Sequence, residues 1–243
     1  MSEAAAPAFL PCGDGAIALE FGKSIDTGIN ARVIALAASV REAGIAGVLE
    51  IVPSYRSLLV RYDPETIRGR ALEERLAELA AHGAARGPSG RRWTIPVLYG
   101  GEAGQDLEEM AAMKGLSSEE LIALHAGGEY RVFMIGFAPG FAYLGGLPEI
   151  LHTPRLQVPR QHVPAGSIGI GGQQGSVNSV AGPSGWRFIG WTPIRIFDAA
   201  RTVPFLLEAG DLVRFKPIGH EEAASLAARA DAGETLLEAS DAS

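Results

Sequence analysis

Glycine is concentrated in one part of the 243-residue sequence, and this limits what that part can fold into. Between Gly127 and Gly190 there are 14 glycines in 64 residues, against 17 in the other 179. Short β-branched or aromatic runs alternate there with Gly and Pro, and helical patterns are almost absent. Strands interrupted this often are typical of a barrel or a sandwich. We expect strands at residues 130–135, 167–170, 187–189, 195–197 and 212–215.

The first hundred residues have a different periodicity, in which strand and helix patterns alternate. The expected elements are a strand at 15–21, a helix between Asp26 and Gly44, strands at 48–52 and 57–62, a helix at 65–82 and a strand at 92–98. A Gly- and Pro-rich linker at 83–90 precedes the last strand. The order β-α-β-β-α-β predicts a split βαβ, or ferredoxin-like, arrangement.

The predicted fold class is therefore α+β, with a ferredoxin-like domain at 1–90 and a β-barrel domain at 91–219. Two short helices are expected at 106–114 and 117–126, the second with a capping box from Ser117 to Glu120. The remaining residues, 220–243, form a polar tail that is rich in Ala and Glu, which is compatible with one exposed helix.

Charge and cysteine content exclude several classes of protein. The 21 Lys and Arg residues against 28 Asp and Glu give a net charge of −7, and no basic run is present, so neither nucleic acid nor an anionic membrane is the expected partner. The single Cys12 excludes an intrachain disulfide and favours a reducing compartment. No apolar stretch approaches the roughly 20 residues of a membrane span. We expect a soluble, cytoplasmic protein with a small-molecule substrate.

Standard catalytic signatures are missing from the sequence. The three lysines, at 23, 114 and 216, do not follow a glycine loop as in a Walker A motif, so any ATP site is unconventional or lies on another chain. The run from Ala165 to Gly169 places Ser167 in a partial nucleophile elbow, but the leading Gly is replaced by Ala165 and no helix pattern follows. No metal-ligand spacing is present, and we predict no metal site in this chain.

Aromatic, arginine and glutamine side chains gather between residues 125 and 193. Phe137, Pro139, Phe141 and Tyr143 lie among glycines, and they either line a pocket or fill the barrel core. Arg155 and Arg160 lie among prolines. They either clamp a carboxylate or phosphate or form ordinary surface ion pairs.

Three further residues are candidates for a site. The amide of Gln173 either contacts a substrate or lies exposed in a turn. Ser167 is a candidate substrate contact. His125, near the end of a predicted helix, is either a proton carrier or a packed helix end.

Several long motifs, taken in order, resemble those of a known family. They are Tyr130-x-Val132, Gly136-Phe137-x-Pro139-Gly140-Phe141-x-Tyr143-Leu144, Thr153-Pro154-Arg155, Pro159-Arg160, Val163-Pro164-Ala165-Gly166-Ser167-x-Gly169-Ile170 and Gly185-Trp186-x-x-Ile189-Gly190-x-Thr192-Pro193. The chain resembles the family of 5-oxoprolinase B subunits, also called KipI-like or allophanate hydrolase subunit 1. One difference is that the Tyr-Pro pair usual in this family is missing from the segment between Ser176 and Gly185.

The resemblance implies a ferredoxin-like part followed by a cyclophilin-like β-barrel. It also implies two partners, a KipA-like C subunit and a third 5-oxoprolinase subunit, with which the chain opens 5-oxoproline to glutamate using ATP. A protein that shares its site with partners need not hold a complete catalytic set, which agrees with the missing signatures. In the pocket that we predict, Phe137, Phe141 and Tyr143 are walls and Arg155, Arg160 and Gln173 are polar anchors.

Other functions remain open at this point. KipI-like proteins also act as regulatory proteins that inhibit a sensor histidine kinase, and other relatives belong to urea carboxylase or accompany allophanate hydrolase. The barrel alone is compatible with a peptidyl-prolyl isomerase, although a shared fold does not establish a shared function.

Overall fold

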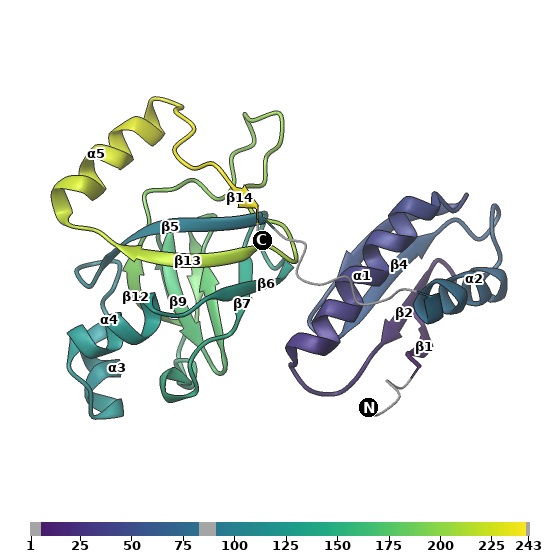
Figure 1. The fold of residues 1–243 in the computed structure, drawn as a ribbon, viewed down its shortest axis with the longest axis horizontal. Helices are drawn as coiled ribbons and strands as arrows, with labels where there is room; N and C mark the ends of the chain where they lie inside the picture. Colours follow the sequence, from purple (N-terminus) through teal and green to yellow (C-terminus); the bar gives the residue numbers. More distant parts are fainter. Residues whose placement is uncertain (1–5, 83–90, 242–243) are drawn as a thin grey trace. The chain divides into compact units, whose positions relative to one another are not determined.

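The computed structural model describes residues 6–82 and 91–241 and divides the chain into two compact units, residues 1–89 and 90–243 (Figure 1). The linker expected at 83–90 lies outside the described residues. Each unit has a hydrophobic core of its own. No helix in the described ranges is both long and apolar enough to span a membrane.

The first unit is a four-stranded antiparallel sheet with two helices. Its elements are β1 (Ala8–Pro11), β2 (Ala16–Glu20), α1 (Thr27–Ala43), β3 (Val48–Pro53), β4 (Ser57–Tyr62) and α2 (Gly69–His82). The strand order is β1-β2-β4-β3. The strand expected at 92–98 does not join this sheet, which is a correction to the sequence-based order. The edge beside β2 is instead occupied by β1, a strand that the periodicity missed because only four residues form it.

Local sequence signals explain why α1 begins and ends where it does. The side chain of Asp26 accepts a hydrogen bond from the backbone N–H of Ile29 at 2.9 Å, which caps the first turn. Gly44 ends the helix in a left-handed conformation with φ of 54°. Between them Val33 and Val40 are almost completely buried against the sheet.

The second unit is a closed β-barrel. The strands of this unit are β5 (Arg91–Tyr99), β6 (Tyr130–Ile135), β7 (Ala142–Gly145), β8 (Arg160–Val163), β9 (Ser167–Gly171), β10 (Gln174–Val177), β11 (Gly182–Ser184), β12 (Arg187–Trp191), β13 (Leu212–Pro217) and β14 (Ser240–Asp241). Strands β8 and β11 form a separate two-stranded sheet. Neighbouring strands follow the order β12-β9-β10-β7-β6-β13-β5, and a further pairing of β5 with β12 closes seven strands into a ring. The predicted α+β fold class is confirmed.

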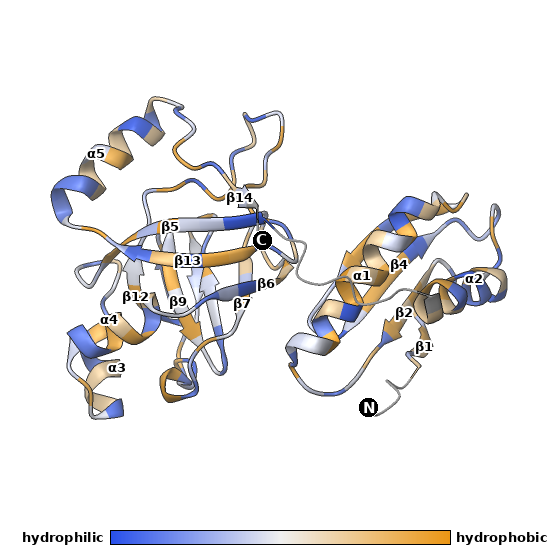
Figure 2. Cartoon of the chain, in the orientation of Figure 1, coloured by the Kyte–Doolittle hydropathy of each residue, from blue (hydrophilic) through white to orange (hydrophobic). Residues whose placement is uncertain are grey.

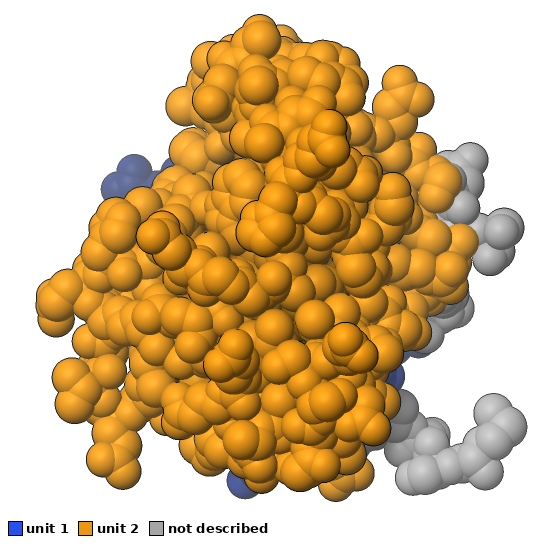
Figure 3. Space-filling view, turned by 90° about the vertical axis from the view of Figure 1, so that its left-hand side faces the viewer, with its two compact units in different colours: residues 1–89 blue, residues 90–243 orange. Residues whose placement is uncertain are grey.

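Four helical segments belong to this unit. They are α3 (Leu107–Lys114), α4 (Ser118–Ala126), the 3₁₀ turn η1 (Glu149–Leu151) and α5 (His220–Asp231). The capping box predicted from Ser117 to Glu120 is present at the start of α4. Figure 2 shows hydrophobic residues along β9 and β13, with hydrophilic residues recurring along α5. Figure 3 shows the face of this unit on the side of α5 and α4.

One strand expected in the barrel is absent. Residues 195–197 form a loop, with a single isolated bridge between Phe197 and Phe205. The N–H of Leu206 donates to the carbonyl of Ile196 at 2.9 Å, and that of Asp198 to Pro204 at 2.9 Å. The backbone therefore bonds within its own loop instead of pairing with a neighbouring strand.

Strand β9 separates the barrel core from an outer aromatic layer. Its Ile168 and Ile170 are completely buried in the barrel core. Gly169 and Gly171 alternate with them and therefore face outward. A Cβ at Gly171 would lie 2.7 Å from the Trp186 ring, and one at Gly169 2.9 Å from the Phe188 ring. These two glycines let aromatic rings lie directly on the strand.

Candidate functional site

The outer aromatic layer, which includes Phe141, Trp186 and Phe188, borders a pocket of about 340 Å³ on the barrel unit. We call it the aromatic pocket. Four of the predicted site residues line it: Phe137, Phe141, Tyr143 and Arg155. The structure adds Leu156, Pro159, Pro183, Ser184, Gly185 and Trp186. The pocket thus lies between the loop after β6, strand β7, the loop before β8 and the turn from β11 to β12.

The aromatic rings of the pocket pack edge to face. The ring centroids of Phe141 and Tyr143 are 4.6 Å apart with an interplanar angle of 62°, and those of Phe141 and Trp186 are 6.0 Å apart at 70°. Phe141 and Trp186 are each about 95% buried. Because edge-to-face pairs are favourable and these rings are mostly buried, they form a fixed wall.

Phe137 has an unusual backbone. It is the only residue other than glycine with a positive φ, 71°, in the ranges that the structure describes. Its ring is 77% exposed and its centroid lies 5.7 Å from that of Phe141, at 74°. A left-handed conformation costs a non-glycine residue about 1–2 kcal/mol. Strain of this kind, combined with an exposed aromatic ring beside a pocket, is typical of a functional position.

Arg155 places an uncommitted positive charge at the pocket. Its guanidinium carbon lies 4.7 Å from the centre of the Trp186 ring, a cation–π arrangement. Arg155 is exposed, and its guanidinium forms no hydrogen bond or ion pair with another described residue. A Cβ at Gly171 would lie 3.1 Å from Nε of Arg155, so the glycine leaves room for the guanidinium as well as for the ring below it. Burial raises the pKa of Tyr143, and the nearby charge of Arg155 partly opposes this rise.

Arg160, which we predicted as a second polar anchor of the pocket, instead forms an ion pair within the chain. Its guanidinium binds both carboxylate oxygens of Asp106, with distances of 2.9 Å to Oδ2 and 2.6 Å to Oδ1. Asp106 is 99% buried and also accepts the backbone N–H of Phe188 at 2.7 Å. Arg160 does not line the pocket. Its charge is already neutralised by a carboxylate of the same chain.

Three other candidates also lie outside the pocket lining. Ser167 is fully buried, and its hydroxyl donates to the carbonyl of Pro164 at 2.9 Å. Gln173 is exposed in the turn between β9 and β10, and Pro139 is exposed in the loop after Phe137. The structure therefore brings four of the predicted residues together and leaves these three apart from them.

His125 lies in the barrel core, not at the pocket. It is completely buried on α4, and its ring stacks on Phe215 with centroids 4.7 Å apart. Its Nδ1 is hydrogen-bonded to the hydroxyl of Tyr99 at 2.8 Å, and its Nε2 has no hydrogen-bond partner among the described residues. Burial lowers the pKa of His125 to about 3, so the ring is neutral at pH 7 and is not an imidazolium that could act as a general acid.

Trp186 is the main pocket residue that the sequence prediction missed. The Gly185-Trp186 pair was visible as a motif, but nothing in its spacing showed that the ring lies beneath Arg155, 31 positions earlier. Among the described residues no group of three or more His, Cys, Asp or Glu side chains is arranged to hold a metal ion.

Comparison with known proteins shows the family to which the chain belongs. The family model described as the carboxyltransferase domain, subdomain C and D, matches residues 7–207. The 5-oxoprolinase B subunit of Bacillus subtilis (strain 168) is 42% identical in an alignment of 224 positions that covers 86% of this chain and 92% of that relative. The chain belongs to the family of 5-oxoprolinase B subunits, as its motifs predicted.

Solved structures share the fold. TTHA0988 is 36% identical with a TM-score of 0.76 over 84% of this chain, which corresponds to 40% of the length of TTHA0988. The urea carboxylase of Kluyveromyces lactis has a TM-score of 0.79 and covers the whole chain with 24% of its own length. Its identity of 18% supports the fold alone.

Proposed function

We propose that this chain is the B subunit of a cytoplasmic, ATP-dependent 5-oxoprolinase that acts with a KipA-like C subunit and a third subunit. The reaction adds water across the lactam C–N bond of 5-oxoproline, so that the carbonyl carbon becomes the γ-carboxylate of glutamate and the nitrogen becomes its amino group. The names of the relatives support the activity of the complex. The aromatic pocket supports a role for this chain in binding the substrate.

The observation that carries the proposed role is the free guanidinium of Arg155 on Trp186. 5-Oxoproline has one carboxylate and one flat, compact ring. A guanidinium binds a carboxylate in two parallel hydrogen bonds, and a neighbouring aromatic wall removes the ring from water. In this arrangement Arg155 holds the carboxylate, while Phe141 and Tyr143 contact the lactam ring.

The exposed ring of Phe137 then covers the bound substrate. Because the fixed rings of Phe141 and Trp186 already enclose one side, a ring held over the open side excludes water from the lactam. Water exclusion strengthens the pairing of Arg155 with the carboxylate.

The lining of the pocket also supports the proposal that the chain acts with partner subunits. Tyr143 keeps its proton because burial raises its pKa, so it can donate a hydrogen bond but cannot act as a base at neutral pH. Among the described lining residues Arg155 is the one cation, and no glycine loop with a lysine is present for a triphosphate. The residues present do not fit ATP, and we place the nucleotide on the partner subunits.

The experiment is reconstitution of the three subunits followed by measurement of glutamate released from 5-oxoproline with ATP. The complete complex is expected to release glutamate, and the Arg155→Gln variant to have its KM raised about 10- to 100-fold, since a hydrogen bond to a charged group contributes roughly 1.5–3 kcal/mol. Arg75→Gln, which removes an exposed arginine of α2, is the matched control and should behave as the wild type.

Two outcomes distinguish a failure of the proposed activity from a failure of the proposed substrate pocket. A complete complex that releases no glutamate overturns the proposed function. Full activity of Arg155→Gln leaves the function intact and overturns the assignment of the pocket. Autophosphorylation of a sensor histidine kinase with and without the chain tests the regulatory alternative.

A further inference from the structure

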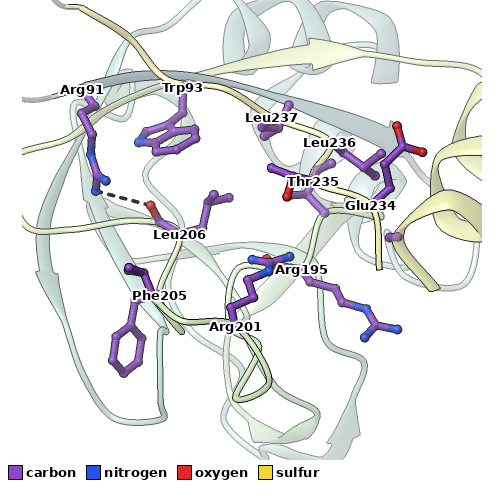
Figure 4. Close-up of a pocket in the computed structure, with 13 residues that line it drawn as sticks. Arg91, Trp93, Arg195, Arg201, Phe205, Leu206, Glu234, Thr235, Leu236 and Leu237 are labelled. Carbon is purple, nitrogen blue, oxygen red and sulfur yellow. Dashed lines mark hydrogen bonds between the residues drawn. The ribbon is translucent and has the colours of Figure 1, made fainter. Parts of the chain in front are cut away.

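A second cavity, of about 270 Å³, lies on the outside of the barrel unit (Figure 4). It is enclosed by the loop between β12 and β13, the C-terminal end of α5 and residues 234–237, which lead to β14. It shares no lining residue with the aromatic pocket. The proposed function makes no use of this cavity.

The walls of the cavity are mainly apolar. Trp93 of β5 and Leu206 of the loop lie on one side, and Leu236 and Leu237 of the C-terminal segment on the other, as Figure 4 shows. The volume lies just below the usual range of pockets for drug-sized ligands. The cavity therefore suits a compact apolar body.

Most charged groups in the wall are already paired. Arg91 binds Asp211 at 2.9 Å, and Arg195 binds Asp231 at 2.7 Å. The carboxylate of Glu234 accepts two hydrogen bonds from Arg229 on α5. These groups leave little net charge for a ligand.

Arg201 is different from the other arginines of the wall. Its Nη1 donates to the backbone carbonyl of Arg195 at 2.9 Å, and its Nε forms an ion pair with Oδ2 of Asp198 at 3.8 Å, a distance too long for a hydrogen bond. Its Nη2 has no partner among the described residues. Figure 4 shows its guanidinium below Thr235, directed into the cavity, whereas the side chain of Arg195 extends away.

We infer that this cavity is a second ligand site, which binds a small monocarboxylate with a compact apolar body. The apolar walls exclude water from such a body, and the unpaired edge of Arg201 offers a charge-assisted hydrogen bond to the carboxylate. A single guanidinium with one open Nη2 matches one negative charge, which disfavours phosphate esters with two.

Benzoate is the probe for this site, and the three tryptophans of the chain are the reporters. The chain contains only Trp93, Trp186 and Trp191, so an NMR spectrum of the labelled protein shows three indole N–H signals. Trp93 lines this cavity and Trp186 the aromatic pocket. Titration with benzoate is expected to shift the Trp93 signal saturably. A simultaneous shift of Trp186 would report separate binding at the aromatic pocket and would leave the result at Trp93 unchanged.

Substitutions test the contribution of the Arg201 charge and that of the cavity volume separately. Arg201→Gln is expected to weaken benzoate binding about tenfold or more, since it removes a charge-assisted hydrogen bond of roughly 1.5–3 kcal/mol. Arg214→Gln on β13, whose exposed ion pair with Glu129 lies outside the cavity lining, is the matched control and should change the affinity less than about twofold. Ala230→Leu fills the cavity from α5 without changing any charge and should abolish binding.

Benzamide has the shape of benzoate without its charge and should bind about tenfold more weakly. The inference is overturned if benzoate does not shift Trp93, if benzamide binds equally well, or if Arg201→Gln leaves the affinity unchanged. A shift of Trp186 alone would assign benzoate to the aromatic pocket and would also overturn it. None of these results depends on 5-oxoprolinase activity.

Discussion

The aromatic pocket and the buried ion pair beside it use the same residue type for opposite purposes. Arg155 and Arg160 are five positions apart in one proline-rich segment. Arg160 is held by two hydrogen bonds to the buried carboxylate of Asp106, while Arg155 stacks on Trp186 and has no carboxylate partner among the described residues. What decides whether an arginine is available to a ligand is whether the fold has already neutralised it.

The two regions also differ in backbone strain. Phe137 at the pocket has a positive φ and an exposed ring, so the chain keeps an unfavourable conformation there. The buried polar residues, Asp106 and His125, are enclosed and hydrogen-bonded within regular elements or at their ends. We expect substitutions in the buried groups to change stability and substitutions in the pocket to change activity.

The largest effect is expected from Asp106→Asn. The variant replaces a buried carboxylate that accepts hydrogen bonds from Arg160 and from the N–H of Phe188, and leaves the Arg160 charge without its partner. Breaking a buried pair by removing one partner costs about 3–5 kcal/mol. Denaturant unfolding measures the loss, and Glu74→Gln on the exposed face of α2 is the control. An unchanged free energy of unfolding would show that this pair does not stabilise the barrel.

A pH dependence of intermediate size is expected from His125. Its pKa is about 3 in the folded chain, whereas the unfolded value is near 6.5. Between these values the unfolded state binds more protons, so the free energy of unfolding falls as the pH is lowered, by up to about 1.4 kcal/mol per pH unit.

His125→Gln removes this contribution and should unfold with a weaker pH dependence between pH 6.5 and 4. Denaturant unfolding at several pH values checks this expectation. Identical slopes in the wild type and the variant would contradict the neutral, buried state of His125.

The smallest change in stability, of opposite sign, is expected from Phe137→Gly. Relief of the left-handed backbone contributes about 1–2 kcal/mol, which exceeds the roughly 0.5–1 kcal/mol that the added flexibility of glycine costs. Stability should rise slightly while glutamate release by the complete complex falls. Phe137→Ala, which removes the ring but keeps the strain, is the matched control and should be less stable than the glycine variant. If both variants retain full activity, the exposed ring has no role in the site.

Local signals made much of the fold predictable. Helix α1 follows from Asp26, Gly44 and an apolar stripe between them, all within 19 residues. The strand at 92–98 was recognised as a strand but assigned to the wrong sheet, because periodicity shows that a segment is extended and does not show which strand pairs with it. The residues 195–197 have β-type side chains, but their backbone hydrogen bonds stay within one loop.

The site was predictable where its residues are close in sequence. Phe137, Phe141 and Tyr143 lie within seven positions and share the pocket. The roles of Arg155 and Arg160 depend on Trp186 and Asp106, which lie 31 and 54 positions away from them. Only the closed barrel brings those pairs together, so no pattern within the segment distinguishes the two arginines.

The pairing of β5 also affects the order in which the chain can fold during synthesis. The first unit completes its sheet and helices from residues 8–82, so it can fold as soon as that length has left the ribosome. Strand β5 emerges next, but its partners β12, β13 and β14 lie about ninety or more residues further on. At a translation rate of 5–20 residues per second the nascent chain carries β5 unpaired for on the order of ten seconds. The barrel therefore forms only after β12 and β13 have been translated, when its first strand and its last strands are present together.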